Sequence, residues 1–512
     1  MVSRVRSIGL QGIGGYDVSA EIFLSGGLPQ FDIVGLPDAA VKEARDRVRA
    51  AIKNTGLSFP VSRVTVNLAP ADTRKEGTIY DLPILLGILA ADESIDPLPD
   101  TAAFVGEMSL TGELRPIRGA LSMALAAGRA GLRELFVPVQ NAAEAAMAGT
   151  VCVRGVPDLH SLLAHLRGES ELPAAEAPEV MTVSHEALDF ADVCGQYTAK
   201  RALEIAAAGS HNVLLIGPPG SGKSMLARRL PTILPDMNRE EMLQATEIHS
   251  LAGRTDKESP VLVQRPFRAP HHTISSVALS GGGTQLRPGE TSLAHNGVLF
   301  LDELPEYPRA VLEVLRQPLE DGEITISRAS GSVTYPSRFM LVCAMNPCRC
   351  GWYGSRRRPC RCTEKSVRNY QEKLSGPLLD RIDIFAHVAS LSYEEMRNRS
   401  AGEPSELIRK RVNSARERQR ERFGSETGCN ARLSGEDLRK YCALSEESSA
   451  LMKRAFDVMG LTARSHDRIL RIARTIADLA GSEDIESVHL AEAIQYRNVD
   501  FLKNEGMETN AL

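Results

Sequence analysis

Long hydrophobic runs are scarce in this sequence. The longest apolar stretch, residues 82–91, contains a proline and falls well short of the ~20 apolar residues that a membrane-spanning helix needs. The first residues, which include Arg4 and Arg6, lead into glycine-rich sequence without the apolar core of a secretory signal. We therefore expect a cytoplasmic protein with no membrane partner.

An excess of positive charge is also missing. The 512 residues include 60 Lys+Arg and 65 Asp+Glu, which leaves a net charge of −5. This balance excludes a wholly basic nucleic-acid binder, so any contact with DNA has to come from a local patch. The hydrophobic content of 43% is typical of folded domains, and the length predicts two to four of them, at about 100–200 residues each.

The patterning predicts an α/β protein with four regions. Residues 1–165 mix strand-like and Ala-rich helical segments, and residues 166–188 have the Glu, Pro, Ala and Ser content of a linker. Residues 189–390 alternate helices, apolar strands and a glycine loop, whereas residues 391–512 are almost entirely helical in pattern. The clearest expected elements are strands at 31–34, 64–67 and 135–139 and helices at 39–51 and 121–130.

A glycine-rich loop follows the apolar run at 213–216. The loop consists of Gly217, Pro218, Pro219, Gly220, Ser221, Gly222, Lys223 and Ser224, and a helical stretch follows it. This spacing between a strand and a helix is that of a P-loop, whose backbone N–H groups and helix N-terminus bind phosphates. We expect Lys223 to contact the β- and γ-phosphates of ATP and the Ser224 hydroxyl to bind Mg²⁺.

Two further apolar runs end in polar residues suited to the same chemistry. The run at 297–301 leads into Asp302 and Glu303, and the run at 339–345 leads into Asn346. Asp302 is expected to hold the Mg²⁺ shell, and Glu303 to orient and deprotonate the attacking water. Asn346 is expected to hydrogen-bond the γ-phosphate or that water. Taken alone, each run could equally be a strand that enters a solvated turn, but the preceding P-loop favours a nucleotide site.

Five segments in this order resemble the ComM/YifB family of magnesium-chelatase-like AAA+ ATPases over essentially the whole chain. They are residues 213–224, 297–303, 344–347, 375–383 and 461–468. The resemblance implies a P-loop AAA+ core with a C-terminal helical lid, ATP and Mg²⁺ as ligands, and a homo-oligomer, expected to be a hexameric ring.

The same resemblance implies roles for four residues. Asn346 matches the first sensor position, and Arg381 matches the arginine finger that completes a neighbouring subunit's ATP site. Arg464 matches the second-sensor arginine, with Arg468 as a competing candidate. Fixed cations of this kind stabilise the charge that spreads over the γ-phosphoryl oxygens in the transition state. The alternative for each arginine is a surface salt bridge, which contributes little.

Three regions outside the cysteine cluster are candidates for DNA contact. Residues 323–335 alternate polar and apolar residues around a glycine, which predicts a β-hairpin with Arg328 near its tip. In the group that the chain resembles, this hairpin projects towards the ring pore. A loop at 265–283 contains His271 and His272, for which we favour a packing or polar-contact role over metal binding. The basic segment at 409–422 fits a solvated helix face or a nucleic-acid contact.

Nine cysteines, an odd number, cannot all pair in disulfides. Four of them lie within fifteen residues: Cys348, Cys350, Cys360 and Cys362. Four thiolates in a reducing compartment are suited to one tetrahedral, structural Zn²⁺, although free thiols and an iron–sulfur cluster remain alternatives. Between the two pairs lie Arg356, Arg357 and Arg358, which we expect to contact the DNA backbone.

Residues 1–165 resemble the proteolytic domain of Lon, a ribosomal-S5-like fold, in the segments 66–72, 75–77 and 110–117. Lon cleaves peptides with a Ser–Lys pair. Residues 78–81 here contain no serine, and residues 118–122 contain no lysine. Thr78 is the remaining hydroxyl, but no suitable base accompanies it. We therefore expect a binding or assembly domain without protease activity.

The leading functional hypothesis is an ATP-driven, ring-forming DNA motor, a helicase that unwinds DNA or moves branches during uptake recombination, as the resemblance to ComM implies. The alternative is a magnesium-chelatase-type motor that drives metal insertion into a tetrapyrrole. The Lon-like region, the four cysteines and the basic loop favour the first hypothesis over the second.

Overall fold

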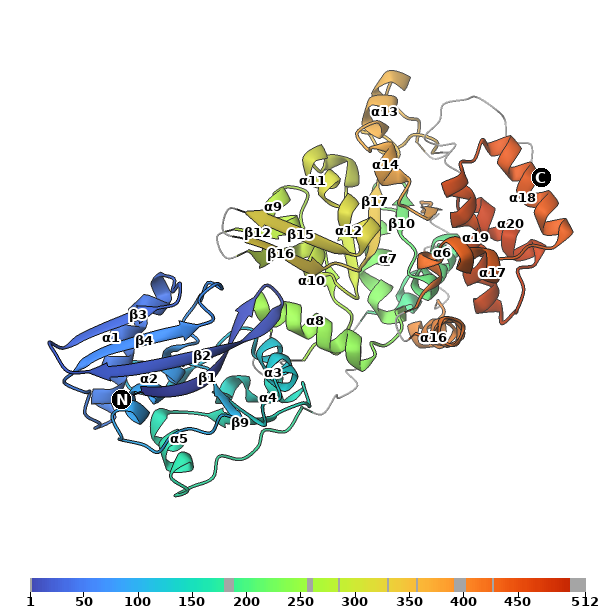
Figure 1. Ribbon diagram of the computed structural model, residues 1–512. Coiled ribbons are helices and arrows are strands. Elements are labelled where there is room, and N and C mark those ends of the chain that lie inside the picture. The colour runs from blue at the N-terminus through green and yellow to red at the C-terminus, as the bar shows by residue number, and fades with distance from the viewer. Residues whose placement is uncertain are drawn as a thin grey trace.

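The chain forms three successive lobes, shown in Figure 1 as a computed structural model. The structure describes residues 2–178, 188–255, 261–283, 286–328, 331–355, 358–390, 402–425 and 428–497. A mixed sheet with helices comes first, a parallel sheet forms the centre, and a helical bundle follows. The strands and helices expected from the sequence in the first two lobes are confirmed, with bounds that differ by a few residues.

The first lobe contains a seven-stranded sheet in the order β3-β4-β2-β1-β5-β8-β9. The helix α2 (Asp81–Ala91) is apolar on every side and buried along its length, so it lies in the core of the lobe. This helix accounts for the longest apolar run of the sequence. The remaining elements are β1 (Val2–Gln11), β2 (Gly14–Ser25), β3 (Gln30–Val34), α1 (Ala39–Asn54), β4 (Arg63–Ala69), β5 (Ala102–Phe104), β6 (Glu107–Met108), β7 (Leu114–Arg115), α3 (Ala120–Arg129), β8 (Glu134–Pro138), η1 (Val139–Asn141), α4 (Ala142–Ala146), β9 (Cys152–Val156) and α5 (Leu159–Leu166).

The expected linker at 166–188 begins on the first lobe. The Ala175 N–H donates to the Val153 carbonyl at 2.7 Å, which places this part of the segment along the edge strand β9. Residues 179–187 lie outside the described residues.

The central lobe is built on a parallel sheet in the order β11-β14-β17-β10-β18. Its three middle strands, β14, β17 and β10, are buried along their whole length, as continuous apolar runs predict. The elements are η2 (Phe190–Asp192), α6 (Tyr197–Gly209), β10 (Val213–Ile216), α7 (Lys223–Arg229), η3 (Leu230–Ile233), α8 (Arg239–Leu251), β11 (Phe267–Arg268), α9 (Ser276–Ser280), β12 (Gly281–Gly282), β13 (Arg287–Pro288), α10 (Glu290–Leu293), β14 (Val298–Leu301), η4 (Leu304–Glu306), α11 (Arg309–Val314), α12 (Arg316–Asp321), β15 (Glu323–Arg328), β16 (Gly331–Pro336), β17 (Met340–Met345), α13 (Glu364–Gln371), α14 (Gly376–Leu379) and β18 (Ile384–His387).

The third lobe is helical throughout its described residues. Asp478 is fully buried and pairs with Arg422 and with Arg474, which ties two of its helices together. The elements are α16 (Ser405–Phe423), η5 (Asn430–Arg432), α17 (Gly435–Tyr441), α18 (Glu446–Met459), α19 (Ala463–Ala480) and α20 (Ser487–Gln495).

Two elements of the central lobe contact the first lobe. Helix α8 lies between the lobes (Figure 1), where Ser250 Oγ donates to Glu144 Oε1 at 2.5 Å and accepts from the Gly119 N–H at 2.9 Å. The hairpin β15–β16, which the sequence predicted, buries Ile324 and Ile326 against Ile13 in the turn between β1 and β2. Leu286 and Val314 of the central lobe complete this cluster, so the hairpin packs on its own lobe and contacts the first lobe at Ile13.

Candidate functional site

The carboxyl edge of the parallel sheet gathers the residues that the sequence predicted for ATP. Strands β10, β14 and β17 run parallel in register, so the residues that follow them meet at one edge. These residues are the P-loop, Asp302 with Glu303, and Asn346. The structure thus brings together three segments that are far apart in the sequence.

The P-loop amine is held by the loop itself. Lys223 Nζ donates to the Gly217 and Pro218 carbonyls at 2.8 and 2.9 Å, and to Asn346 Oδ1 at 3.1 Å. Burial lowers the pKa of Lys223, while the Asp302 and Glu303 carboxylates raise it. The amine therefore lies beside the sensor amide, where one phosphate group can contact both.

Three features of the loop fit a bound phosphate chain. Gly217 has no space for a side chain, because a Cβ there would lie 2.2 Å from the Val388 carbonyl oxygen. Gly222, immediately before α7, has a φ of +94°, a left-handed conformation that glycine adopts without strain. The Ser221 hydroxyl is buried and has no hydrogen-bond partner among the described residues. These residues fit the triphosphate of ATP, whose oxygens are hydrogen-bond acceptors.

The residues predicted for Mg²⁺ lie in contact. Ser224 Oγ donates to Asp302 Oδ2 at 2.5 Å, and the Glu303 N–H donates to Asp302 Oδ1 at 2.9 Å. A hydroxyl and a carboxylate at this separation supply the oxygen ligands that Mg²⁺ prefers. Glu303 has a φ of +52°, an uncommon conformation for a residue other than glycine, and its side chain is 59% exposed. The exposed carboxylate therefore remains accessible to water at the edge of the sheet that carries the P-loop.

His272 also lies in the candidate ATP site, although the sequence did not predict it there. Its Nδ1 atom lies 3.4 Å from Glu303 Oε2, and its ring lies against His271 and, edge-on, against Tyr307. The polar-contact role favoured for the two histidines therefore has a specific partner, the expected catalytic carboxylate. No sequence signal connects the two positions, because the contact depends on the loop after the edge strand β11.

Gln196 is a second residue that was missed. It lies before α6 with a φ of +54°, and its Nε2 donates to the Ser221 carbonyl at 3.1 Å and to the Ala389 carbonyl at 2.6 Å. The side chain joins the P-loop to the end of β18. The only available signal was the Gly195–Gln196 pair ahead of a helix.

The predicted arginines lie at the opposite edge of the sheet. Arg381 precedes β18, whose first residue pairs with the first residue of β10, whereas the P-loop follows the last residue of β10. At about 3.3 Å per residue, the four-residue strand separates the two levels by roughly 13 Å. The Arg381 side chain is 9% exposed, pairs with Glu320 and donates to the Pro377 carbonyl at 2.6 Å. Burial lowers its pKa, and Arg316, Arg464 and Arg468 lower it further.

Arg464 and Arg468 join Arg381 at this edge and differ in their contacts. Arg468 Nε lies 3.3 Å from Asp383 Oδ1, and both side chains are nearly buried. Arg464 is 68% exposed and lies 3.8 Å from Asp380. Because Arg468 is engaged inside the chain, Arg464 is the better candidate for a contact outside it.

The structure describes some of the arginines that the sequence predicted to contact DNA. Arg328 lies at the end of β15, exposed, close to Gly282. The Arg358 guanidinium stacks on Trp352, 5.3 Å from the ring centroid. Arg356 and Arg357 lie outside the described residues. On the basic helix α16, Arg411 pairs with Glu204 and Glu403, and Arg422 with Asp478, so this face is largely occupied within the chain.

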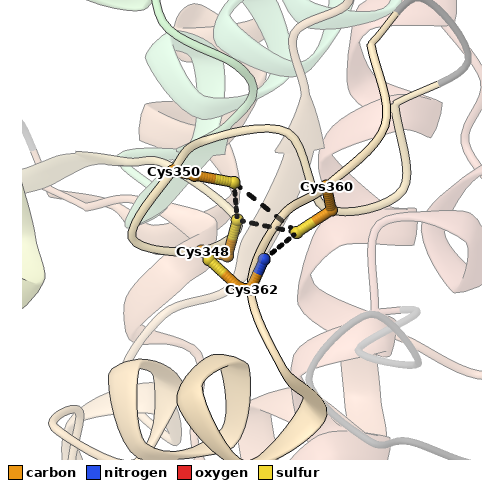
Figure 2. Close-up of side chains that lie close together, drawn as sticks. All are labelled: Cys348, Cys350, Cys360 and Cys362. Atoms are coloured by element: carbon orange, nitrogen blue, oxygen red, sulfur yellow. Dashed lines mark hydrogen bonds between the residues drawn. The ribbon is translucent and has the colours of Figure 1, made fainter.

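The four clustered cysteines meet around one point, as Figure 2 shows. Their sulfur atoms all lie within 4.8 Å of one another, and Cys348 is fully buried. Backbone N–H donation, chiefly from Arg361, lowers the pKa of Cys350 to about 6, while burial raises that of Cys360 to about 12. Four sulfur donors in this arrangement fit a tetrahedral metal such as Zn²⁺.

The hydroxyl of Thr78 in the first lobe contacts a carboxylate. Thr78 Oγ1 hydrogen-bonds with Glu107 Oε2. The nearby Lys75 amine is buried and donates instead to the Pro70 and Thr73 carbonyls. The Lys75 amine and the Thr78 hydroxyl therefore have different hydrogen-bond partners.

Comparison with known proteins covers all three lobes. The family model "Magnesium chelatase, subunit ChlI" matches residues 189–396, that of the ChlI C-terminal region matches residues 402–497, and "Subunit ChlI of Mg-chelatase" matches residues 20–141. The chain is 44% identical to YifB of Salmonella typhimurium over 96% of both chains, and 45% identical to the competence protein ComM of Haemophilus influenzae over 94% of both. It is 27% identical to the magnesium-chelatase 38 kDa subunit of Cereibacter sphaeroides, over 31% of this chain and 52% of that one.

None of the described helices is both long enough and apolar enough to cross a membrane.

Two substitutions test the ATP site directly. Lys223→Ala should lower ATP turnover by about 10²–10³-fold, because it removes the fixed cation at the phosphates. Glu303→Gln should keep nucleotide binding but lower turnover by about 10²–10⁴-fold, since an amide accepts no proton from water. Steady-state phosphate release and binding of a fluorescent ATP analogue measure both. Lys453→Ala, an exposed lysine on α18, is the control, and wild-type turnover in either site variant would contradict the assignment.

A double substitution tests whether His272 acts through Glu303. His272→Ala should lower kcat about fivefold, equivalent to one hydrogen bond of about 1 kcal/mol, with little change in KM. In the Glu303→Gln background the same change should have no further effect, because the group that it positions is already lost. Additive losses in the double variant would show that His272 acts elsewhere.

Proposed function

The chain belongs to the ComM/YifB family of magnesium-chelatase-like AAA+ ATPases, and we propose that it assembles into a cytoplasmic hexameric ring that moves or unwinds DNA, including branched DNA, at the expense of ATP. Within each subunit, Lys223 binds the phosphates, Ser224 and Asp302 hold Mg²⁺, and Asn346 orients the γ-phosphate. Glu303 accepts the proton of the attacking water. Magnesium supplies charge neutralisation when it is bound.

The observation that carries the ring is the position of Arg381. It lies with Arg464 at the amino edge of the sheet, away from the P-loop of its own subunit. An arginine there is suited to the ATP site of an adjacent subunit and not to its own. Head-to-tail contact of the two edges repeats around an axis and closes into a ring. Arg464, which is exposed beside Arg381, supplies the second cation of that contact.

Three features support DNA as the substrate. The relative with 45% identity over 94% of both chains is named a competence protein. The β15–β16 hairpin exposes Arg328 at its end, and Arg358 is presented on the ring of Trp352. Guanidinium groups of this kind bind phosphate without reading bases, which suits a motor that has to act on any sequence.

A chelatase-type motor is the second candidate, because the family models carry that name. The chelatase subunit of Cereibacter sphaeroides, however, shares 27% identity over only 31% of this chain. ATPase assays with single-stranded DNA, branched DNA and a porphyrin added in turn separate the two. Stimulation by porphyrin and not by DNA would establish the second candidate and overturn the first.

Two accessory roles complete the proposal. The four cysteines hold one structural Zn²⁺ through their thiolates, a ligand set that closes the coordination shell. The Lon-like first lobe acts in binding or assembly and not in proteolysis, consistent with the separate engagement of Lys75 and Thr78.

Mixed rings test the shared ATP site. Arg381→Ala should abolish hydrolysis while nucleotide binding is nearly unchanged, because it removes a cation from the neighbour's site only. Mixing it with Lys223→Ala should restore part of the activity, since some interfaces then combine an intact finger with an intact P-loop. Co-assembly is checked by differential tags. Co-assembled mixtures that never recover activity would contradict the role in trans.

Salt-dependent binding tests the DNA contacts. Replacement of Arg356, Arg357 and Arg358 by Ala should weaken binding to all sequences alike and reduce the slope of log K against log[salt] by about 2–3, through lost counterion release. Arg328→Ala should reduce ATP-coupled branch migration more than binding. Fluorescence anisotropy at several salt concentrations measures the first effect, with Arg45→Ala on α1 as the control. An affinity that does not respond to salt would exclude a phosphate-based interface.

A further inference from the structure

The four sulfur atoms have the spacing of a metal site. Cys348 Sγ lies 3.4 Å from Cys350 Sγ and 3.6 Å from Cys360 Sγ, and the latter two are 3.5 Å apart. Bonds of 2.3 Å to a tetrahedral zinc place sulfurs about 3.8 Å apart. The three sulfur–sulfur distances are slightly shorter than this, so small outward shifts of the side chains bring them to the coordinated separation. Figure 2 shows the four side chains gathered around one point.

Backbone N–H groups donate to at least two of the four sulfurs. The N–H groups of Arg361 and Trp352 donate to Cys350, and the Cys362 N–H donates to Cys360 Sγ at 3.4 Å. Four thiolates around Zn²⁺ carry a net charge of −2, and Arg349 adds positive charge within the same loop. N–H donors and nearby cations are the surroundings that a metal–thiolate centre needs.

This cluster is joined directly to the ATP site at two points. Asn346, which accepts a hydrogen bond from Lys223, is separated from Cys348 by Pro347 alone. Beyond Cys350, the Gly351 backbone lies against the P-loop, since a Cβ at Gly351 would be 2.4 Å from Pro219 Cδ. One loop thus contains the sensor residue, the sulfur ligands and a surface that packs on the P-loop.

We propose that the Zn²⁺ at these four cysteines is a clamp on the ATP site, which holds the 347–362 loop against Pro219 and fixes Asn346 for hydrolysis. This inference rests on the proposed zinc site and on the ATPase activity of the family. Zinc takes no part in phosphate chemistry here, because Mg²⁺ has its own ligands in Ser224 and Asp302. Its contribution is to join Cys348 and Cys350 to Cys360 and Cys362, in described residues that form no helix or strand between β17 and α13. The rate of ATP hydrolysis consequently depends on zinc occupancy.

Reversible metal removal tests the clamp in the full-length protein. We expect about one zinc per chain by mass spectrometry, released by a mercurial thiol reagent and detected with a chromogenic chelator. After the reagent is removed with excess thiol and chelator, basal ATPase without DNA should be at least about tenfold lower, in the range found for lost support of a metal site. Added Zn²⁺ should restore it. Cys350→Ser and Cys362→Ser should lose zinc and activity together, whereas Cys152→Ser on β9 should lose neither.

A pair of glycine substitutions tests the contact with the metal ligands intact. Gly351 and Gly354 have similar left-handed φ values of +83° and +72°, but a Cβ at Gly354 meets nothing within 4 Å. Gly351→Ala should therefore lower ATP turnover several-fold with zinc retained, while Gly354→Ala should not. The backbone strain is common to both, so the difference reports the contact with Pro219.

The possible results distinguish the clamp proposal from the zinc-site and DNA-motor hypotheses. A zinc-free chain that hydrolyses ATP at the wild-type rate, or equal turnover in the two glycine variants, overturns the clamp even if zinc binds. Wild-type protein that contains no zinc and takes up none, or that contains iron instead, overturns the zinc site and the clamp with it. Zinc-dependent ATPase that DNA does not affect supports the clamp and contradicts the DNA motor.

Discussion

The parallel register of β10, β14 and β17 is the constraint on which the rest of the central lobe depends. Because the three strands run parallel and end close to one another, the Lys223 amine, the Asp302 carboxylate and the Asn346 amide meet at one edge although they are far apart in the sequence. The buried apolar side chains of these strands keep that register, since a slip would move polar residues into the core. The packing that keeps the strands in register therefore also fixes the geometry of the phosphate site.

The same sheet separates Arg381 from the P-loop of its own chain. A parallel strand has two different ends, and its carboxyl end is occupied here by the P-loop while its amino end carries Arg381. Arg381, Arg464 and Arg468 bring positive charge to the amino edge. Burial lowers the pKa of Arg381, and repulsion from the neighbouring arginines lowers it further. An anion placed against that edge relieves the repulsion. The triphosphate of an adjacent subunit is an anion of that kind, so the two edges are complementary in charge as well as in position.

The sequence predicted the parts of the site that local pattern specifies. The P-loop, Asp302, Glu303 and Asn346 each follow an apolar strand, and their local signals needed no knowledge of tertiary structure. His272 and Gln196 could not be predicted, because their roles arise only where the β11 loop and the start of α6 fold back onto the site. The choice between Arg464 and Arg468 also required the structure, since it depends on which arginine Asp383 engages. The four cysteines were visible in the sequence, but the contact of Gly351 with Pro219 was not.

The first lobe contacts the ATPase lobe at two places. Helix α8 follows the P-loop helix and η3 in the chain and is bonded to the first lobe through Ser250 and Glu144, whose burial raises the pKa of that carboxyl group. A buried acid with these partners is costly to expose, so α8 and the first lobe are expected to move as one body. Ile13 meanwhile packs on the β15–β16 hairpin, which connects through β16 to the strand that ends at Asn346. The first lobe therefore contacts an element that leads directly into the strand ending at Asn346.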